Sequence, residues 1–302
     1  MKSNQVPQKI KLSVLCPVYN GGDFVVKNID NLIDALKDTS LCFEVIISDD
    51  FSHDYTEKAC EDIKKKYFNI IRVYRQKKNI GIYANYNFLI AKSKGEYFVT
   101  MDQDDTPEFL FYNEAVNFLE KNKLYSLAYS HARVIGSQSN KIIRYETCFN
   151  MGVGEFARDR FVNTIINNET LAMVGVIRKK YFNRTRGYVC IPGGDHILLN
   201  ELSLYGDFFC FDKICYDYYE DEEKYIKSSD VQKISGKRYF FQTHWILKNI
   251  ESVWLYPEFN TINKIIMSFS VCRIQNFFFI KDLFMILNVN FWIEVLSIKR
   301  RR

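Results

Sequence analysis

The feature of this chain that most constrains its fold is a series of short, continuous apolar runs, each followed by polar residues. The runs cover Lys11 to Val18, Phe43 to Ser48, Ile70 to Tyr74 and Tyr97 to Met101. Apolar runs without a polar alternation are typical of parallel strands buried on both faces. The sequence therefore predicts an α/β fold with a mostly parallel sheet in the N-terminal half.

The segments between these runs carry apolar residues at helical spacing, as Val25, Ile29 and Leu32 do. Helices are predicted over about Phe24 to Leu36, Thr56 to Tyr67 and Ile82 to Ser93, and further along over Phe156 to Asn167 and His196 to Tyr205. Strands are predicted over Leu127 to Ile135 and Leu171 to Ile177. Strands that alternate with helices indicate a sheet with helices on both faces.

Charge divides the chain of 302 residues unevenly. Residues 231–302 hold 11 Lys/Arg against 4 Asp/Glu, whereas residues 1–230 hold 30 against 32. We expect one domain over residues 1–230, with a first half at about 11–110 and a second half at about 111–230. Residues 231–302 are expected to form a helical, basic and aromatic extension.

The longest apolar stretch of the extension, Leu283 to Ile298, is shorter than the roughly 20 residues that a spanning helix needs. A helix lying on an anionic inner membrane surface fits its length and its basic end, Lys299 to Arg302. The alternative is an ordinary core helix with a solvated basic end. Because the basic groups lie in the tail rather than on the folded body, nucleic acid is not expected as a partner.

The composition is that of a globular protein, with 47% hydrophobic and 25% charged residues, and it excludes a disordered chain. The eight cysteines form no CxxC pair, so we expect them to be reduced, buried and structural. The first ten residues contain no apolar signal segment. The expected location is the cytoplasm, as a peripheral protein on the cytoplasmic face of the membrane.

Acidic residues follow two of the predicted strands. Asp49 and Asp50 follow one strand, and Asp102-Gln103-Asp104-Asp105 follows another. The carboxyl ends of parallel strands meet at one edge of a sheet, where ligands bind. Three carboxylates within four residues repel one another unless a hard cation such as Mg²⁺ or Mn²⁺ is bound. The alternative for this cluster is a helix-capping turn that leads into Thr106 and Pro107.

These segments together resemble the N-terminal motifs of family 2 glycosyltransferases with the GT-A fold. The resemblance rests on LSVLCPVYNG at Leu12 to Gly21, IISDDFSHD at Ile46 to Asp54, Asn79-Ile80-Gly81 with Asn85-Tyr86-Asn87, and GEYFVTMDQDD at Gly95 to Asp105. It covers about residues 11–110 in order and spacing. The DQDD form is similar to the rhamnosyltransferase-like branch that builds bacterial surface polysaccharides.

The resemblance implies roles for individual residues. Asp50 contacts the nucleotide base, Asp102 the ribose side of the donor, and Asp104 and Asp105 hold Mn²⁺ or Mg²⁺ on the diphosphate. The residues that the resemblance places around the donor are Pro17, Val18, Tyr19, Asp50, Asn79, Gly81, Asp102, Gln103 and Asp104. The same resemblance implies the GT-A fold, in which residues of about 11–110 form the nucleotide-sugar half and residues of about 111–230 form the acceptor half.

Gly193-Gly194-Asp195-His196 is similar to the acidic motif that opens the acceptor-side helix of this family. The resemblance makes Asp195 the general base that takes the proton of the acceptor hydroxyl. The alternative is that Asp195 is an ordinary N-cap of an apolar helix. We expect His196 to be an acceptor-site or structural residue.

Two departures from the family pattern stand out. The motif after the second strand is usually Asp-Asp-Gly-Ser, and here Phe51 replaces the glycine, which is expected to alter the turn and with it the contact of Asp50 with the base. Many relatives also carry a basic element after the acceptor helix, whereas here Tyr216 to Glu223 is acidic and is predicted to be solvated surface. Either a basic group near Lys224 to Arg238 or the metal is then expected to neutralise the diphosphate.

The function implied is an inverting, metal-dependent hexosyl or deoxyhexosyl transfer from a UDP- or dTDP-sugar to a hydroxyl of a growing cell-surface glycan, free or lipid-linked. One alternative is a catalytically inactive glycan-binding or scaffold protein at the membrane. Phe51 and the absence of the basic element favour this alternative. The other is a phosphatase, because Asp102 to Thr106 fits a DxDxT signature in which Asp102 is the nucleophile.

Overall fold

The computed structural model describes residues 9–102, 106–147, 151–167, 170–220 and 237–287. The chain divides into two compact units, Met1–Glu220 and Asp221–Arg302, and each is described by itself.

The first part of the N-terminal unit is the predicted alternation of strands and helices. It contains β1 (Leu12–Val18), α1 (Gly22–Leu36), β2 (Phe43–Asp49), α2 (Thr56–Lys66), β3 (Ile71–Arg75), α3 (Ile82–Lys92) and β4 (Tyr97–Thr100). These strands are parallel and lie in the order β3-β2-β1-β4. Val18 pairs with Asp49, so β1 and β2 end at the same edge of the sheet. The α/β class and the parallel arrangement predicted for these four strands are confirmed.

The second part of this unit extends the same sheet with strands of mixed direction. It contains β5 (Thr106–Pro107), α4 (Leu110–Lys121), β6 (Tyr125–Gly136), β7 (Ile142–Glu146), α5 (Ala157–Asn167), the 3₁₀ helix η1 (Thr170–Val174), β8 (Val176–Arg178), α6 (Lys179–Phe182), α7 (Gly194–Tyr205) and β9 (Asp207–Glu220). The strand order continues as β4-β8-β6-β9-β5, with β7 paired to β6. β8 runs antiparallel to both of its neighbours.

Two predictions for this part need correction. The single strand predicted over Leu171 to Ile177 is instead η1 followed by β8, with Gly175 between them. A Cβ on Gly175 would lie 2.6 Å from the Ala128 carbonyl oxygen, so the chain turns there in close contact with β6. The acidic run from Tyr216 was predicted to be solvated surface, but Tyr216 to Glu220 belong to β9, where Asp217 accepts two hydrogen bonds from Arg133 at 2.7 and 2.8 Å.

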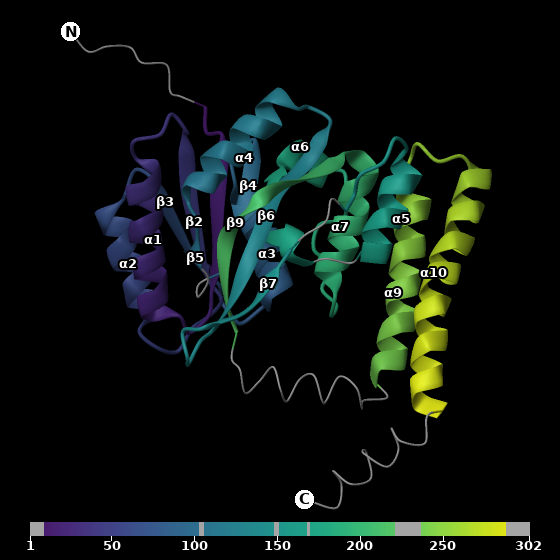
Figure 1. Ribbon diagram of the computed structural model, residues 1–302. Coiled ribbons are helices and arrows are strands. Elements are labelled where there is room, and N and C mark those ends of the chain that lie inside the picture. Colours follow the sequence, from purple (N-terminus) through teal and green to yellow (C-terminus); the bar gives the residue numbers. More distant parts are fainter. Residues whose placement is uncertain (1–8, 103–105, 148–150, 168–169, 221–236, 288–302) are drawn as a thin grey trace, which may run out of the picture. The chain divides into compact units, whose positions relative to one another are not determined.

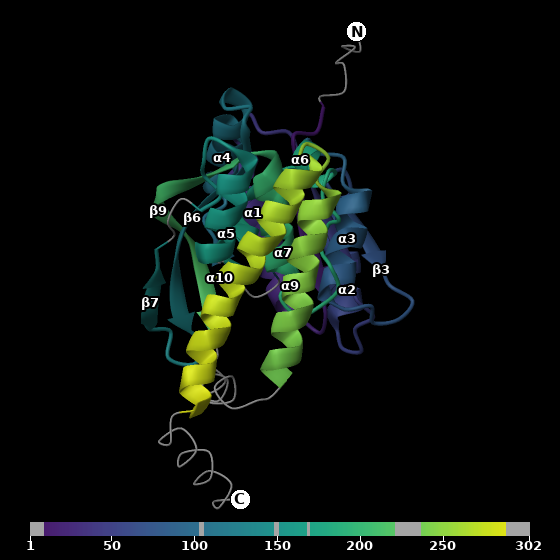
Figure 2. The same ribbon diagram turned by 90° about the vertical axis from the view of Figure 1, so that its right-hand side faces the viewer.

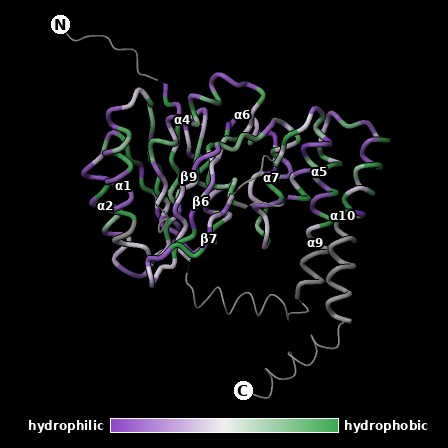
Figure 3. The backbone as a smooth tube through the Cα atoms, viewed as in Figure 1, coloured by the Kyte–Doolittle hydropathy of each residue, from purple (hydrophilic) through white to green (hydrophobic). Residues whose placement is uncertain are grey.

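Helices cover both faces of the sheet (Figure 1). One core cluster joins α1, α2 and α4 to the face that carries Val14, Cys16 and Val45. The other joins α3 and α7 to the opposite face, which carries Leu15 and Ile46. The helices alternate between hydrophobic and hydrophilic stretches along the tube in Figure 3, as expected when each buries only one side.

The cysteines are free thiols in the described residues, and their burial varies. Cys16, Cys60 and Cys215 are buried, and burial raises the pKa of the Cys60 thiol to about 12. Cys190 is exposed, because it lies in the loop that precedes α7. The prediction of uniform burial is therefore wrong for Cys190, and Cys42, Cys210 and Cys272 are only partly buried. Cys148 lies outside the described residues.

The described part of the C-terminal unit is a pair of helices, α9 (Lys237–Leu255) and α10 (Thr261–Leu287), which lie side by side (Figures 1 and 2). The Trp254 indole donates a hydrogen bond to Ser268 Oγ at 3.1 Å, and Lys264 Nζ donates to the Trp254 carbonyl at 2.8 Å. Neither these helices nor any other described helix has the length and hydropathy to cross a bilayer. Residues 288–302 of the predicted interfacial helix lie outside the described residues.

Candidate functional site

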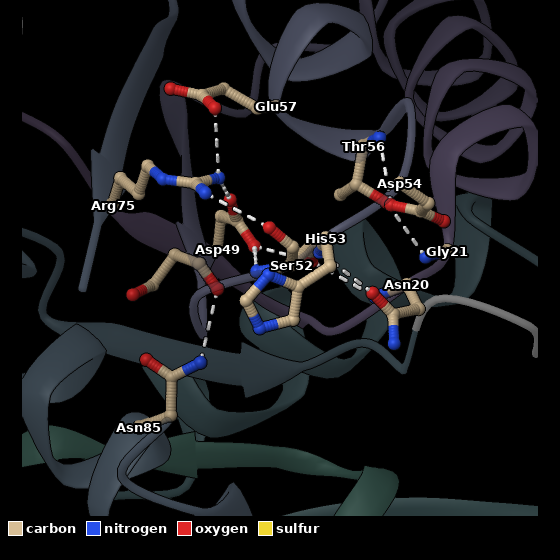
Figure 4. Close-up of polar contacts among 11 residues, drawn as sticks. Asn20, Gly21, Asp49, Ser52, His53, Asp54, Thr56, Glu57, Arg75 and Asn85 are labelled. Atoms are coloured by element: carbon tan, nitrogen blue, oxygen red, sulfur yellow. Dashed lines mark hydrogen bonds and ion pairs between the residues drawn. The ribbon is translucent and has the colours of Figure 1, made fainter. Parts of the chain in front are cut away.

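A network of side chains fixes the turn that follows β2 (Figure 4). The Asp49 carboxylate is buried; it accepts hydrogen bonds from Ser52 N at 2.9 Å and Ser52 Oγ at 2.5 Å, and it pairs with the Arg75 guanidinium. Arg75 also donates to the Ser52 carbonyl at 2.9 Å. A buried carboxylate needs such partners because an uncompensated charge is costly away from water. The turn between β2 and α2 is thereby held by its own polar groups.

Phe51 lies within this turn at φ +67°, in the left-handed region that glycine favours. A side chain in this region costs about 1–2 kcal/mol. The Arg75 guanidinium lies 5.5 Å from the centroid of the Phe51 ring, close enough for a cation–π attraction that offsets part of this cost. The replacement of the family's glycine by Phe51 therefore leaves a glycine-like backbone in the turn.

Asp50 connects the end of β2 to the start of α3. Its two carboxylate oxygens accept hydrogen bonds from the backbone N–H groups of Ile80 and Gly81, at 2.8 and 2.9 Å. Gly81 adopts φ +83° as the residue before α3, and the Asn85 amide donates to the Ser48 carbonyl at 3.0 Å. These bonds fix the first turn of α3 against the sheet edge.

A cavity of about 300 Å³ opens at this edge, which we call the first cavity. It is lined by Pro17, Val18, Tyr19, Asp50, Asn79, Gly81, Ile82, Asn85 and Asp102. The structure thus brings together all the predicted donor-binding residues that it describes. Gln103, Asp104 and Asp105 lie outside the described residues. The predicted contact of Asp50 with a base remains a prediction, and it would use lone pairs that the two backbone N–H groups leave open.

A second cavity, of about 460 Å³, shares Ile82 and Asp102 with the first. Its other lining residues are Tyr83, Tyr86, Thr100, Val134, Arg144, Glu146, Leu171, Met173, Val174, Tyr188, Asp195 and Tyr218. The predicted base Asp195 and the strand-end residue Asp102 therefore line one hollow, although they are far apart in the sequence.

Asp195 lies in the first turn of α7 and is not its N-cap, a position that Gly193 occupies at φ +73°. Gly194 is packed so closely that a Cβ there would lie 1.9 Å from the Val189 carbonyl oxygen. The Asp195 Oδ1 atom accepts hydrogen bonds from the Tyr83 hydroxyl at 3.3 Å and from His196 N at 3.0 Å. Within the described residues both bonds fall on Oδ1, which leaves Oδ2 for a ligand in the cavity.

Three stacked tyrosines connect Asp195 to Asp102. The Tyr188 ring stacks on Tyr83, with centroids 5.8 Å apart, and on Tyr86, with centroids 4.9 Å apart. The Tyr86 hydroxyl donates to Asp102 Oδ1. Burial, with the Asp195 charge nearby, raises the pKa of Tyr83 to about 12, and burial raises the pKa of Tyr188 well above its ordinary value. The Tyr83 hydroxyl therefore keeps its proton at neutral pH and remains a hydrogen-bond donor.

His196 follows Asp195, and burial lowers its pKa although the Asp195 charge acts in the opposite direction. Arg144 and Glu146 of β7 form an ion pair at 2.7 Å on the wall of the second cavity. Among the described residues that line the two cavities, Arg144 is the one cation. Arg144 was not predicted as a site residue because β7 carries no recognisable motif. Tyr83 was not predicted either, although its position two residues after the predicted site residue Gly81 is a signal that could have found it.

The end of β4 offers oxygen atoms of the kind that a hard divalent cation binds, because the Asp102 carboxylate lines both cavities there. In the part of the chain that the structure describes, no group of three or more His, Cys, Asp or Glu residues is placed to hold a metal. The predicted ligands Asp104 and Asp105 belong to the residues left undescribed. Mn²⁺ or Mg²⁺ binding therefore stays a prediction.

Comparison with known proteins adds the family. Residues 13–183, more than half of the chain, match the family model described as Glycosyl transferase family 2. The chain belongs to this family. Membership argues against the phosphatase interpretation of Asp102 to Thr106, and it does not distinguish the rhamnosyltransferase-like branch from other branches.

Curated relatives of this family 2 chain match only part of it. It is 33% identical over 96 residues to poly(ribitol-phosphate) beta-glucosyltransferase of Bacillus spizizenii, which covers 32% of this chain and 15% of that protein. It is 31% identical over 137 residues to dolichyl-phosphate beta-glucosyltransferase of Dictyostelium discoideum, which covers 42% of each. The chain thus spans less than half the length of either relative.

Solved structures confirm the GT-A-like fold. Residues 1–349 of TarS from S. aureus align with a TM-score of 0.59 at 16% identity, covering 87% of this chain and 71% of that one. The mannosyltransferase PcManGT from Pyrobaculum calidifontis, in complex with GDP-Man and Mn²⁺, aligns with a TM-score of 0.51 at 10% identity, covering 93% and 81%. At such identities the likeness concerns the fold alone.

Proposed function

We propose that this family 2 protein transfers a sugar from a UDP- or dTDP-linked donor to a hydroxyl of a cell-surface glycan, with inversion at the anomeric carbon and with Mn²⁺ or Mg²⁺ bound. The observation that carries the proposal is the pair of cavities that share Asp102 and Ile82. The first holds the predicted donor-binding residues, and the second holds Asp195. The proposed nucleotide cavity thus adjoins the cavity that contains the Asp195 carboxylate. A direct displacement requires the donor and the base to lie next to each other in this way.

In the proposed reaction the nucleotide occupies the first cavity. Asp50 keeps Ile80 and Gly81 in place through two backbone hydrogen bonds, so the wall of the cavity exists before the donor arrives. Such preorganisation reduces the ordering cost of binding. A bound Mn²⁺ or Mg²⁺ would supply neutralisation of the diphosphate charge.

The acceptor occupies the second cavity with its hydroxyl at Asp195. Oδ2 takes the hydroxyl proton while Tyr83 and His196 N retain Oδ1. The acceptor oxygen bonds to the anomeric carbon, and the bond from that carbon to the diphosphate breaks with its electron pair on the diphosphate. Arg144, supported by Glu146, provides positive charge on the wall where the basic element of other relatives is missing.

Three finer assignments belong to the same proposal. The donor sugar is a hexose or deoxyhexose, the acceptor is a free or lipid-linked glycan, and the protein works as a peripheral protein on the cytoplasmic face of the membrane. The relatives that act on poly(ribitol-phosphate) and on dolichyl phosphate support a polymeric or lipid-linked acceptor by analogy. The excess of positive charge in residues 231–302 supports the membrane location.

The proposal is tested first by nucleotide binding. Thermal unfolding is measured with UDP, dTDP and GDP, each with Mn²⁺, with Mg²⁺ and with EDTA. A ligand present at 100 times its dissociation constant adds about 2.7 kcal/mol of stability, which gives a clear rise in melting temperature. We expect UDP or dTDP to act in the presence of metal.

The second test is turnover, followed as nucleoside diphosphate release from the matching nucleotide-sugar. Metal-dependent release supports the enzyme. Binding of glycans without release from any nucleotide-sugar would instead support the inactive glycan-binding alternative. Absence of any nucleotide-dependent shift would contradict the donor site itself.

A further inference from the structure

One face of α10 exposes large apolar side chains in a regular pattern. Ile262, Ile265, Ile266 and Phe269 are 68%, 44%, 55% and 73% exposed. Their spacing of i, i+3, i+4 and i+7 places them on one side of the helix. We call these four residues the α10 stripe. Four exposed large apolar residues on one helix face are more than the scattered single residues that ordinary surfaces carry.

The neighbouring helix does not cover the α10 stripe. Lys264 and Ser268, which hydrogen-bond to Trp254 of α9, lie roughly a third of a turn around α10 from the stripe. Met267 and Val271, on the side away from the stripe, are buried. Within the described part of its unit, α10 therefore packs on one side and presents the stripe on the other.

Charge indicates what the stripe meets. Arg273 is exposed one turn beyond Phe269 on the same face of the helix, and residues 231–302 carry 11 Lys/Arg against 4 Asp/Glu. An apolar helix face within a cationic segment fits the boundary between the acyl chains and anionic headgroups of a bilayer. A surface for a second copy of this chain would bring two such positive segments together, which disfavours that occupant.

We propose that the α10 stripe is a membrane-contacting surface that enters the headgroup region of a bilayer rich in anionic lipid. This places the contact on Ile262 to Phe269, upstream of the terminal segment considered from the sequence. The inference does not depend on sugar transfer, because vesicle binding is measured without any donor.

The test uses the full chain and vesicles of phosphatidylcholine with or without phosphatidylglycerol. Phe269→Ser is compared with Phe68→Ser, which removes an equally exposed phenylalanine, 73% in both cases, from the N-terminal unit. The variant that combines Ile266→Ser with Phe269→Ser is measured as well. We expect the fraction of this double variant that sediments with phosphatidylglycerol vesicles to fall about tenfold, and the fraction of Phe68→Ser to stay unchanged. Thermal unfolding checks that all variants fold.

Three results would overturn the proposal. The first is wild-type binding by the Phe269 and Ile266 variant, and the second is equal binding of the wild type to vesicles with and without phosphatidylglycerol. The third is a wild-type dimer in light scattering that the stripe substitutions convert to a monomer, without any vesicle binding. Nucleotide-dependent thermal shifts are recorded for the same samples, so failure of the donor site remains distinguishable.

A second inference concerns Tyr83, and it rests on the proposed function. Of the two donors to Asp195 Oδ1, His196 N is backbone, so Tyr83 is the side chain that sets how the carboxylate is oriented. Tyr83 is itself held by stacking on Tyr188. We propose that Tyr83 is a positioning residue, which holds the Asp195 carboxylate so that Oδ2 faces the acceptor hydroxyl.

Removal of the Tyr83 hydroxyl then has a specific effect on the carboxylate. The side-chain bond to Oδ1 is lost, whereas the backbone bond from His196 N remains. The Tyr188 ring still stacks on the aromatic ring that Tyr83→Phe retains. The substitution therefore changes how Asp195 is oriented and leaves the packing around it in place.

We expect Tyr83→Phe to lower kcat about tenfold, the scale of a lost hydrogen bond to a charged group, and to leave the KM for the donor unchanged. The matched control is Tyr67→Phe, which also removes a tyrosine-to-carboxylate hydrogen bond, to Asp30 at 2.8 Å, away from both cavities. An unchanged kcat in Tyr83→Phe, or an equal loss in Tyr67→Phe, would contradict the proposal.

A measurement without turnover separates this inference from the proposed function. The Asp195 carboxyl carbon is observed by NMR in ¹³C-labelled protein at neutral pH and assigned with Asp195→Asn. A chemical shift that changes in Tyr83→Phe but not in Tyr67→Phe supports the positioning role even if no donor is found. An unchanged chemical shift in Tyr83→Phe overturns it, and an inactive wild type overturns only the proposed function.

Discussion

The two cavities share a border at Asp102 and Ile82 but are built in different ways. The first is shaped by strand ends and by backbone hydrogen bonds within residues 17–102, such as those from Ile80 and Gly81 to Asp50. The second draws its walls from segments between α3 and β9, and stacked tyrosines connect two of its carboxylates, Asp195 and Asp102. The first is a local construction, whereas the second depends on the whole fold of the N-terminal unit.

If the protein transfers a sugar as proposed, donor binding and turnover should respond to different substitutions. Substitutions in the first cavity should alter donor binding with modest effects on turnover of bound donor. Substitutions in the second should alter turnover or stability with little effect on donor affinity. The four predictions that follow test this division, beginning with the largest expected effect.

The largest effect is expected for Asp195→Asn. Without a base for the acceptor proton, kcat should fall by about 10³-fold, since general-base catalysis contributes roughly 10²–10⁴. The thermal shift with the donor nucleotide should persist. Stopped assays of nucleoside diphosphate release give kcat. Asp159→Asn is the matched control, because Asp159 lies in the first turn of α5 and outside both cavities; equal losses in the two variants would remove Asp195 from its role.

Next in size is Gly194→Ala, which should lower the free energy of unfolding by about 3 kcal/mol. Its Cβ would meet the Val189 carbonyl at 1.9 Å, and backbone cannot move aside as a flexible side chain can. Gly81→Ala in the first cavity meets nothing within 4 Å and carries only the strain of φ +83°, about 1 kcal/mol. Denaturant unfolding compares the two. Equal losses would show that the second cavity is not the more tightly packed one.

Asp50→Ala should weaken donor binding about 30-fold, which corresponds to about 2 kcal/mol, the scale of a lost hydrogen bond to a charged group. The partly buried backbone N–H groups of Ile80 and Gly81 lose their acceptor, so the wall of the first cavity is no longer preorganised. Isothermal titration with the donor nucleotide measures the dissociation constant. Turnover at saturating donor should change less than threefold, and a larger loss there would link the two cavities more closely than their construction suggests.

The smallest effect is expected for Phe51→Gly. Glycine removes the strain at φ +67°, but it also loses the contact with Arg75 and gains freedom in the unfolded chain. These effects oppose one another, so the free energy of unfolding should change by less than about 1 kcal/mol. Donor affinity should change less than threefold. A large loss of stability would mean that Phe51 holds the turn rather than merely being tolerated in it.

The first cavity could be predicted from the sequence because its residues follow consecutive parallel strands. Once Lys11 to Val18 and Phe43 to Ser48 were assigned as strands, the direction of the sheet placed Asp50 beside Pro17 and Val18. The helix limits agree with the prediction within two residues for α1, α2, α3, α5 and α7. Helical periodicity and strand-end polarity are local signals, and they were sufficient here.

The second cavity could not be predicted in the same way. β7 has the burial pattern of a mostly exposed strand, and the acidic end of β9 looked like solvated surface. Arg144 and Tyr218 reach the cavity only because both strands pair with β6, a contact that no local pattern encodes. Asp195 was found through family resemblance, whereas its partners Tyr83 and Tyr188 became visible only when α3 and the loop before α7 were placed together.

Helix α3 and the residues just before it line both cavities. Asn79, Gly81 and Asn85 line the first, Tyr83 and Tyr86 line the second, and Ile82 lines both. One helix therefore sets the distance between the two cavities, and this suggests how the nucleotide preference could be redesigned. Grafting a foreign turn between β1 and α1 should exchange the nucleotide preference while α3 preserves the alignment, whereas grafting α3 itself should require a matching α7.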